Sequence, residues 1–357
     1  MRYAYAGLVA AILAVSVSSS DAAEPALPLV TEEFMVESAD PGIQLYVRNK
    51  YPADLSEVPP DHILLYVHGA SQPSEATFDL VLDGVSWMEF IAGHGWDVYL
   101  MDVRGYGGST RSSEFTQVDA TKAPPVSTDM KVRDVEAVID FILKRRGGAK
   151  IHLLGWSYGT VVIPAYAVKH PDKVSSLVLY GPVWCQPSCA FDPRPPEISD
   201  AELKRREMLP MAESPMATAR ARTQMGVPFG RREELLPPAW FEAWWTAALK
   251  NDPVGANKAS PVLRTPSGID LDWADYWDRG RSYYDPKKVT APTLIIVGRM
   301  DQQTPVRWAR ALHGALENSA GRRIVVIEDA SHVMMLEKNR MALFETMQRF
   351  LDASQAP

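Results

Sequence analysis

The sequence predicts an α/β protein in which a mostly parallel central sheet is flanked by helices and carries an inserted helical cap. Apolar runs typical of buried strands alternate with helical patterns, and this alternation implies parallel strands joined by crossover helices. It stops for about a hundred residues, where prolines and short helical signals take its place. We therefore assign residues 24–183 and 288–357 to the sheet domain and residues 184–287 to the cap.

The first half of the sheet domain contains two predicted strands that end in polar turns. One runs over residues 61–67 and ends in the turn at residues 68–70, and the other runs over residues 96–101. Helical stretches lie near residues 86–93 and 128–146. In open α/β sheets, ligands bind beyond the carboxyl ends of the strands, so functional side chains are expected at these turns.

A third strand, over residues 150–156, leads directly into a Gly-x-Ser-x-Gly sequence centred on Ser157. A serine on a sharp strand-to-helix turn has strained backbone angles and points its hydroxyl outward. The residues two before and two after it must then be small, as Gly155 and Gly159 are. The following helix, to about Lys169, lends its N-terminal dipole to a developing oxyanion. The pattern predicts that Ser157 is a nucleophile.

Two later strands also end close to a polar side chain. The strand that begins at Ala291 is followed by Asp301, and the strand over residues 323–327 is followed by His332. The chain order is therefore Ser157, Asp301, His332, with each residue just past a strand. This order is typical of one lineage of serine triads and differs from the orders of the two well-known serine proteases.

The chain resembles the α/β-hydrolase family in four elements that occur in order. These are the turn His68-Gly69-Ala70, the segment Asp102-x-Arg104-Gly105-x-Gly107-x-Ser109, the Ser157 turn, and the Asp301 and His332 loops. The resemblance covers roughly residues 42–351 and is to cap-bearing members, which include carboxylesterases, lipases, carbon-carbon bond hydrolases and prolyl-aminopeptidase-like enzymes. It implies the α/β-hydrolase fold and a serine hydrolase.

Two departures narrow this resemblance. The haloalkane dehalogenases and epoxide hydrolases of the family carry aspartate where this chain has Ser157, which argues against both chemistries. Prolyl aminopeptidases usually show His-Gly-Gly-Pro-Gly where this chain has residues 68–73, which weakens that assignment.

The expected chemistry is attack of Ser157 Oγ on a carbonyl carbon. His332 acts as general base, and Asp301 holds the imidazole in the tautomer that accepts the proton. The backbone N–H groups of Ala70 and Tyr158 are expected to bind the oxyanion. An acyl-enzyme then forms, and a water activated by the histidine releases it.

Other acids and histidines near these motifs are expected to have structural roles. Asp102 precedes the nucleophile and lies in a tight turn, where turn capping or pairing with Arg104 is its expected role. Asp329 lies too close in sequence to His332 to be a confident orienting partner. His68 is expected to shape the oxyanion turn by hydrogen bonding.

Neither a metal nor an organic cofactor is predicted. The remaining histidines show no spacing that converges on a metal, and the glycine-rich segment near residue 105 lacks the complete dinucleotide fingerprint. The chain has 37 basic and 44 acidic residues, a formal net charge of -7, and no long basic stripe. We therefore expect a small-molecule ester or amide substrate and no nucleic-acid partner.

The N-terminus has the layout of a secretory signal peptide. Arg2 is followed by an apolar run from Ala4 to Val17, which is too short to span a bilayer, and then by a small-residue cleavage pattern. We expect residues 1–22 to be removed, which leaves a secreted or periplasmic enzyme without a stable membrane anchor. An uncleaved anchor is the alternative.

Only two cysteines are present, Cys185 and Cys189. In an oxidising compartment they are expected to form a local disulfide, which closes a small loop where the chain enters the cap. Two unreacted thiols are the alternative interpretation.

The cap is rich in aromatic side chains and is expected to form the roof of the substrate pocket. Most of these side chains should pack the cap onto the sheet domain. The residues expected to contact substrate are Trp156, Trp184, Trp240 and Trp244. An aromatic roof favours a substrate with an apolar or aromatic group.

Three classes of function fit these observations. The leading one is a secreted serine hydrolase that cleaves a carboxylic ester of a small to medium substrate, with carbon-carbon bond hydrolysis possible on the same triad. The second is a prolyl-aminopeptidase-like peptidase or amidase, which needs cap carboxylates such as Glu202, Glu207, Glu233 or Glu242 to hold a substrate ammonium. The third is a non-catalytic ligand-binding member of the fold, against which the complete triad argues.

Overall fold

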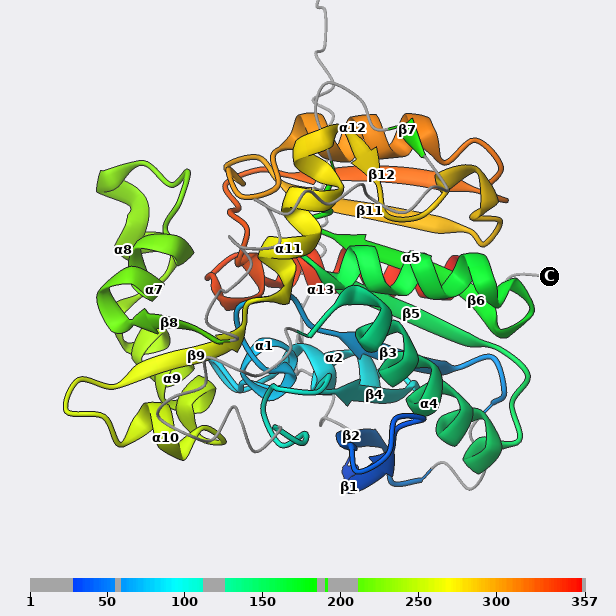
Figure 1. Cartoon of the computed structure of the whole chain (residues 1–357), viewed down its shortest axis with the longest axis horizontal. Helices are drawn as coiled ribbons and strands as arrows, with labels where there is room; N and C mark the ends of the chain where they lie inside the picture. The colour runs from blue at the N-terminus through cyan, green and yellow to red at the C-terminus, as the bar shows by residue number, and fades with distance from the viewer. Residues whose placement is uncertain (1–27, 55–58, 112–125, 185–189, 192–210, 355–357) are drawn as a thin grey trace, which may run out of the picture.

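The structure is a computed structural model of the chain and describes residues 28–54, 59–111, 126–184, 190–191 and 211–354. Its centre is an eight-stranded sheet with the order β1-β2-β4-β3-β5-β6-β11-β12 (Figure 1). The strands are β1 (Leu29–Glu37), β2 (Gln44–Pro52), β3 (Ile63–Val67), β4 (Asp97–Met101), β5 (Ile151–Trp156), β6 (Val174–Tyr180), β11 (Thr293–Gly298) and β12 (Arg322–Ile327).

Six neighbouring strands of this sheet, from β4 to β12 in the spatial order, run parallel to one another. The two strands at the other edge, β1 and β2, pair antiparallel to each other, and β2 pairs antiparallel to β4. The predicted mostly parallel sheet is therefore confirmed. Its carboxyl edge carries the ends of β3, β5, β11 and β12, which the sequence analysis associated with functional residues.

The antiparallel pair β1 and β2 was not among the expected elements. β1 is an edge strand in which most side chains keep accessible surface, and its sequence mixes glutamates with apolar residues. An edge strand does not require the continuous apolar run that marks a strand buried on both faces. The local pattern of this segment was therefore too weak to predict a strand.

Helices cover both faces of the sheet (Figure 1). In β3 the residues at odd positions, Ile63, Leu65 and Val67, belong to one core cluster, while Leu64 and Tyr66 belong to another on the opposite face. The first cluster includes buried residues of α4 (Thr128–Arg146), α5 (Gly159–Lys169) and α12 (Val306–Ala315). The second includes residues of α1 (Ser74–Phe78), α2 (Trp87–Gly93) and α13 (Met341–Ala353).

The cap is not purely helical, which corrects the expectation from the sequence. Its strands β8 (Met211–Pro215) and β9 (Val262–Pro266) pair antiparallel. These two segments are separated by about fifty residues, so no local turn sequence indicated the pairing. The helices between and after them are α7 (Met216–Thr223), α8 (Arg232–Leu235), α9 (Pro238–Leu249), α10 (Pro253–Ala256) and α11 (Gly268–Asp275).

Short elements complete the described chain. Two-residue strands, β7 (Ala190–Phe191) and β10 (Arg281–Ser282), pair parallel. Single turns of 3₁₀ helix occur as η1 (Pro171–Lys173), η2 (Phe229–Arg231), η3 (Trp277–Arg279), η4 (Pro286–Lys288) and η5 (Met334–Leu336).

Helix α9 attaches the cap to the sheet domain through an aromatic face. It begins with a proline at its first turn, where the missing N–H costs no hydrogen bond. Phe241, Trp244, Trp245 and Ala248 are buried at helical spacing, and they join the core cluster on the α2 and α13 face. The expectation that most cap aromatics pack the cap onto the core is met by this helix.

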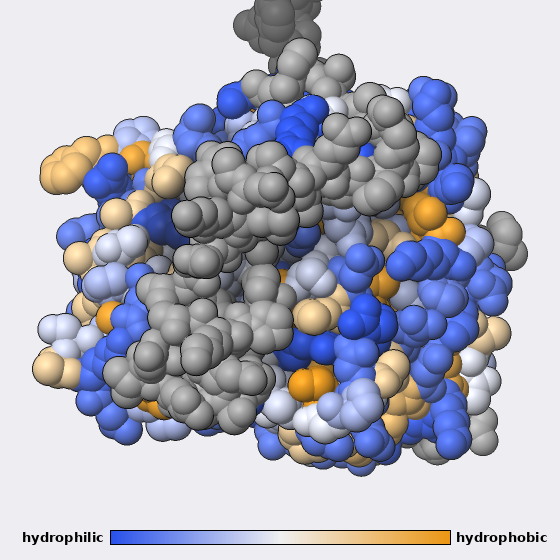
Figure 2. All heavy atoms as spheres, in the orientation of Figure 1, coloured by the Kyte–Doolittle hydropathy of each residue, from blue (hydrophilic) through white to orange (hydrophobic). Residues whose placement is uncertain are grey.

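The face of the molecule in Figure 2 is mainly hydrophilic over α4 and α5, and its apolar spheres are scattered rather than gathered into one area. None of the helices in the described part of the chain is both long and apolar enough to cross a membrane. The predicted signal segment, residues 1–22, lies outside the described residues, as do Cys185 and Cys189.

Candidate active site

Ser157 lies on a strained turn between β5 and α5. Its φ angle is +53°, in the left-handed region that non-glycine residues rarely adopt, and its N–H donates to the Tyr180 carbonyl at 2.9 Å. A Cβ atom at Gly155 would collide with the Gly159 carbonyl, and one at Gly159 would collide with the Val67 carbonyl. Both glycines are therefore required by close packing, as the sequence pattern predicted.

His332 and Asp301 are in direct contact at the same edge of the sheet. Asp301 follows β11 and His332 follows β12, and Nδ1 of the imidazole lies 2.8 Å from Oδ2 of the carboxylate. Both side chains are almost fully buried, at 3% and 1% exposed. An Nδ1–H that donates to the carboxylate leaves Nε2 unprotonated and able to accept a proton.

The Asp301 carboxylate is held by its own loop. Oδ1 accepts hydrogen bonds from the N–H groups of Gln303 at 2.9 Å and Thr304 at 2.8 Å. Oδ2 accepts from the Thr304 hydroxyl at 2.8 Å, in addition to His332. These donors fix the carboxylate and, through it, the orientation of the imidazole ring.

The backbone and ring of His332 are also fixed from the sheet side. Its carbonyl oxygen accepts hydrogen bonds from Trp156 Nε1 at 3.0 Å and from the Tyr180 hydroxyl at 2.8 Å. Gly181, with a φ of +58°, lies so close that a Cβ there would be 3.0 Å from Cε1 of the imidazole. Two side chains from β5 and β6 and one glycine therefore position the ring.

The turn after β3 passes beside Ser157. A Cβ at Gly69 would lie 2.8 Å from the Cβ of Ser157. Within the described residues, neither the Ala70 nor the Tyr158 backbone N–H donates a hydrogen bond to the protein. An oxyanion hole requires backbone amides that are free to donate, and these two amides, one in the turn beside Ser157 and one in the residue after it, meet that requirement.

His68 shapes this turn in the neutral form. Its Nε2 accepts a hydrogen bond from the Val103 N–H at 3.2 Å, so the proton is on Nδ1, which lies 2.6 Å from the Gly69 carbonyl. Burial lowers the pKa of the imidazole to about 3. A histidine with both ring nitrogens engaged by the backbone has the structural role expected from the sequence.

The other two acids considered for the triad have different partners. Asp102 is buried and caps turns, accepting from the N–H groups of Ser74 at 2.7 Å and Gly108 at 3.0 Å. Asp329 is exposed and pairs with Arg231 at 2.5 Å. Among these acids, Asp301 is the one that contacts His332.

The residue after Ser157 is anchored by the cap, and sequence reasoning missed this contact. The Tyr158 hydroxyl donates to Oδ2 of Asp272 in α11 at 2.8 Å and lies 2.5 Å from Oγ1 of Thr128. Burial raises the pKa of the Asp272 carboxyl. No local pattern connects residues that are 114 positions apart.

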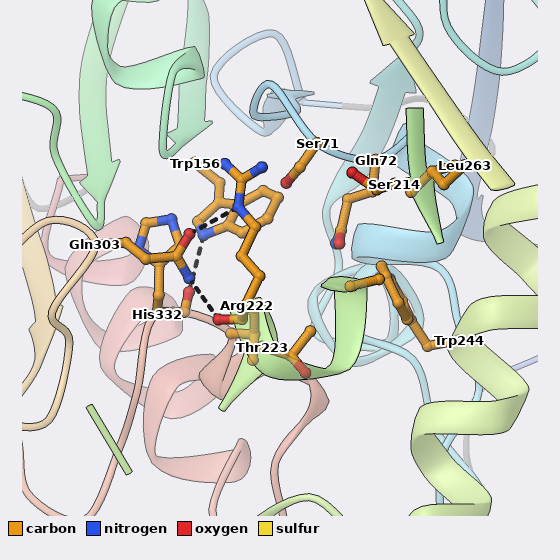
Figure 3. A pocket seen from close by; sticks show the side chains of 12 residues that line it. Ser71, Gln72, Trp156, Ser214, Arg222, Thr223, Trp244, Leu263, Gln303 and His332 are labelled. Carbon is orange, nitrogen blue, oxygen red and sulfur yellow. Dashed lines mark hydrogen bonds between the residues drawn. The ribbon is translucent and has the colours of Figure 1, made fainter. Parts of the chain in front are cut away.

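A pocket adjoins the site between His332 and the cap (Figure 3). Its lining residues are Ser71, Gln72, Trp156, Ser214, Ala219, Arg222, Thr223, Trp244, Leu263, Gln303, His332 and Val333. The free volume is about 20 Å³, roughly the space of one water molecule. The pocket reaches the site through His332 and Trp156, and Ser157 is not among its lining residues.

Two of the four tryptophans expected at the substrate line this pocket, Trp156 and Trp244. Trp184 is buried and packs against Tyr284, with 6.0 Å between the ring centroids. The Trp240 ring lies under the Arg340 guanidinium at 4.7 Å. Sequence composition marked the aromatic residues of the cap but did not determine which of them face the pocket.

Arg222 is a pocket residue that the sequence analysis did not single out. Its Nε donates to the Gln303 side-chain oxygen at 3.1 Å, and the Gln303 amide nitrogen donates to the Arg222 carbonyl at 3.1 Å (Figure 3). Gln303 also donates its backbone N–H to Asp301. The cap helix α7 is therefore tied to the loop that carries Asp301.

The two described glutamates of the cap that were considered for an ammonium site, Glu233 and Glu242, are not among the residues that line this pocket. Glu233 and Glu242 are exposed on α8 and α9, and Glu202 and Glu207 lie outside the described residues. Across the part of the chain that the structure describes, no group of three or more His, Cys, Asp or Glu side chains is arranged to hold a metal ion.

The Ser157 hydroxyl makes no hydrogen bond to any described residue. Catalytic hydrogen bonds are often long without substrate and tighten only in the substrate complex. The arrangement of a serine on a strained turn, a histidine paired with a buried carboxylate and two free amides can support acyl transfer to serine.

Comparison with known proteins places the chain in a family. The family model of the alpha/beta hydrolase fold matches residues 63–339, so this protein belongs to the α/β-hydrolase family. The chain is 25% identical over 268 residues to a proline iminopeptidase of Saccharolobus solfataricus. This match covers 72% of this chain and 81% of that protein.

Other relatives have other activities. The chain is 26% identical over 249 residues to a pimeloyl-[acyl-carrier protein] methyl ester esterase of Neisseria meningitidis. This match covers 68% of this chain and 64% of that protein. A solved thermophilic esterase from Thermogutta terrifontis superposes with a TM-score of 0.58 at 17% identity, covering 91% of this chain and 100% of that one. At this level of identity, the similarity to the solved esterase shows a shared fold.

Proposed function

We propose that this protein is a serine hydrolase that cleaves a carboxylic ester of a small to medium substrate, with Ser157, His332 and Asp301 as its catalytic triad. The observation that carries the proposal is the 2.8 Å contact between His332 Nδ1 and Asp301 Oδ2 beside the strained Ser157 turn. Esterases among the relatives and structural neighbours support the same class of chemistry.

The proposed reaction follows from the roles of these groups. Ser157 Oγ attacks the ester carbonyl carbon while His332 Nε2 takes the hydroxyl proton, and Asp301 stabilises the imidazolium that forms. The N–H groups of Ala70 and Tyr158 hold the oxyanion. The ester C–O bond then breaks, and the imidazolium gives its proton to the departing alcohol. Water, deprotonated by His332, attacks the acyl-enzyme and releases the acid.

The substrate side of the proposal rests on the pocket walls. Trp156, Trp244 and Leu263 supply apolar surface, which suits a substrate with an apolar or aromatic portion. We further propose that residues 1–22 direct export to the periplasm or the medium. In that compartment, Cys185 and Cys189 would form their disulfide, and no membrane anchor or nucleic-acid partner is proposed.

A prolyl-aminopeptidase-like activity is the second candidate, since one relative is a proline iminopeptidase. Such an enzyme must hold the free ammonium of its substrate with carboxylates. The pocket beside His332 instead contains the guanidinium of Arg222, while Glu233 and Glu242 point to solvent. Positive charge at this position disfavours a cationic substrate.

The test is a comparison of two substrate types on the mature protein. Hydrolysis of 4-nitrophenyl esters of increasing acyl length and of proline 4-nitroanilide should be measured side by side for the wild type and Ser157→Ala. The proposal expects ester turnover that disappears in Ser157→Ala and little anilide turnover. Dominant anilide turnover would assign the protein as an aminopeptidase. Ester turnover that survives in Ser157→Ala would refute the role of Ser157 as the nucleophile.

A further inference from the structure

Arg222 brings a positive charge into a pocket whose other described lining residues, His332 apart, have uncharged side chains. In Figure 3 its side chain extends across the pocket between Gln303 and His332 on one side and Ser71 and Gln72 on the other. Apart from His332, every other described residue that lines the pocket has an uncharged side chain. A guanidinium remains protonated in proteins, so this charge is permanent.

Most of the hydrogen-bonding capacity of this guanidinium is unused. Nε donates to Gln303, while Nη1 and Nη2 have no hydrogen-bond partner among the described residues. Gln303 is a neutral amide and does not balance the charge. Asp270 attracts Arg222 electrostatically but forms no ion pair with it. With respect to the described residues, four of the five N–H donors of the fork are therefore open to a ligand.

The surroundings make an anionic ligand the one that fits. Arg222 keeps exposed surface, and partial desolvation by the surrounding protein lowers the pKa of its guanidinium. An apolar substrate group that covered the guanidinium would remove its water and return no hydrogen bonds, which is costly. A carboxylate would replace that water with two parallel charge-assisted hydrogen bonds.

Arg222 forms part of the wall of a small pocket. The free volume is about 20 Å³, so a group that enters the pocket lies close to the Arg222 side chain. Trp156, Trp244 and Leu263 add apolar surface to the same pocket, and this surface can pack against methylene groups. The pocket thus combines apolar walls with one positive charge.

We propose that Arg222 binds a carboxylate of the substrate, so that the preferred substrates are esters with an anionic group a few carbon atoms from the scissile bond. This inference rests on the proposed ester hydrolysis and specifies its substrate class. The carboxylate can belong to the acyl part, as in a half-ester of a dicarboxylic acid, or to the alcohol part. Both sources present the same group to Arg222.

Two matched pairs of esters test the proposal and distinguish the sources. For the acyl part, mono-4-nitrophenyl glutarate is compared with 4-nitrophenyl pentanoate, which has the same number of acyl carbons and a methyl group in place of the carboxylate. For the alcohol part, 3-carboxyphenyl butyrate is compared with 3-carbamoylphenyl butyrate. The value of kcat/KM is measured for wild type, Arg222→Gln, Arg222→Lys and Arg220→Gln, after circular dichroism has shown that each variant is folded.

Arg220→Gln is the matched control because it removes one positive charge from the same helix. Arg220 stacks on Phe241, 4.1 Å from the ring centroid, and does not line the pocket. The wild type should prefer the anionic ester of at least one pair. Arg222→Gln should lose about 10- to 100-fold in kcat/KM on that ester and change less than about 3-fold on its neutral partner. Arg222→Lys should retain part of the preference, and Arg220→Gln should retain all of it.

The proposal is overturned if the wild type shows no preference in either pair, or if the preference persists in Arg222→Gln. Failure of the proposed function has a different signature, namely no Ser157-dependent turnover of any ester. In that case, calorimetric titration of glutarate into wild type and Arg222→Gln decides the inference independently. Binding that is lost in Arg222→Gln supports it, and equal or absent binding refutes it.

Discussion

The carboxylate of Asp272 accepts a hydrogen bond from the Tyr158 hydroxyl at 2.8 Å and thereby joins cap helix α11 to the residue that follows Ser157. Thr128 adds its backbone N–H, at 3.1 Å, and its hydroxyl, at 2.5 Å, to the same carboxylate oxygen. All three residues are buried. Because the Tyr158 backbone is one proposed oxyanion donor, the cap also stabilises the Ser157 turn.

Replacing this tyrosine should measure the strength of that link. Tyr158→Phe removes one donor from the buried Asp272 carboxylate, so the free energy of unfolding in urea should fall by about 1–3 kcal/mol. Tyr166→Phe is the control, since the Tyr166 hydroxyl is buried without a hydrogen-bond partner among the described residues. That variant should be as stable as wild type or more so. Equal losses of unfolding free energy in the two variants would show that the hydrogen bond between Tyr158 and Asp272 makes no net contribution to stability.

The choice of Asp301 as the orienting acid can be tested against Asp329, the acid that lies near His332 in the sequence. Asp301→Asn should lower kcat on a 4-nitrophenyl ester by roughly 10³- to 10⁴-fold with little change in KM, because the imidazole loses the carboxylate that fixes its tautomer. Asp329→Asn, at an exposed site that pairs with Arg231, should keep wild-type kcat. A large loss in Asp329→Asn together with a small one in Asp301→Asn would contradict the assignment.

Gly181 lies so close to the His332 ring that a larger side chain there should disturb the position of the ring. Gly181→Ala places a Cβ 3.0 Å from the imidazole Cε1 in a backbone with a φ of +58°. We expect about 1–2 kcal/mol of backbone strain and a drop in kcat of about tenfold or more, because the ring must shift. The measurements are thermal unfolding and ester hydrolysis.

The variant Gly147→Ala is the control that separates the effect of backbone strain from the effect of shifting the His332 ring. Gly147 has a φ of +66°, but a Cβ there meets nothing within 4 Å. This variant should lose a similar amount of stability and keep wild-type kcat. If Gly147→Ala reduced kcat as much as Gly181→Ala, the effect at Gly181 would reflect general destabilisation.

The neutral His68 should contribute to the pH dependence of stability. Its folded pKa is lowered to about 3 by burial, against about 6.5 for histidine in an unfolded chain. Between these values the unfolded state binds a proton that the folded state does not, so stability falls as the pH falls from about 6.5 towards 3. The contribution approaches about 1.4 kcal/mol per pH unit and is absent above this range.

Urea unfolding at pH 6.0, 5.0 and 4.5 checks this expectation. Over that range the free energy of unfolding should fall less steeply with decreasing pH in His68→Asn than in the wild type. The difference in slope should correspond to about one proton bound on unfolding. The exposed His94 supplies the control, and His94→Asn should keep the wild-type slope. A His68→Asn slope equal to that of wild type would mean that this histidine is not responsible for the acid sensitivity.

Much of the sheet domain could be predicted because its information is local. The run of apolar residues in β5, followed by Gly155 and Gly159, identified both the strand and the turn at Ser157. The positions of Asp301 and His332 just past β11 and β12 then followed from the parallel topology, which gathers strand ends at one edge. The edge strand β1 has no such run, and it was missed.

The sequence by itself therefore determined the order of strands and helices, the Ser157 turn and the set of residues that could form a triad. Only the tertiary structure decided that Asp301 contacts His332, that Asp272 holds Tyr158, that β8 pairs with β9, and that Arg222 lines the pocket. The physical reason is that strand and helix formation depends on side-chain periodicity within a segment. Hydrogen bonds and burial between distant residues depend instead on how whole elements pack, and no local pattern records that packing.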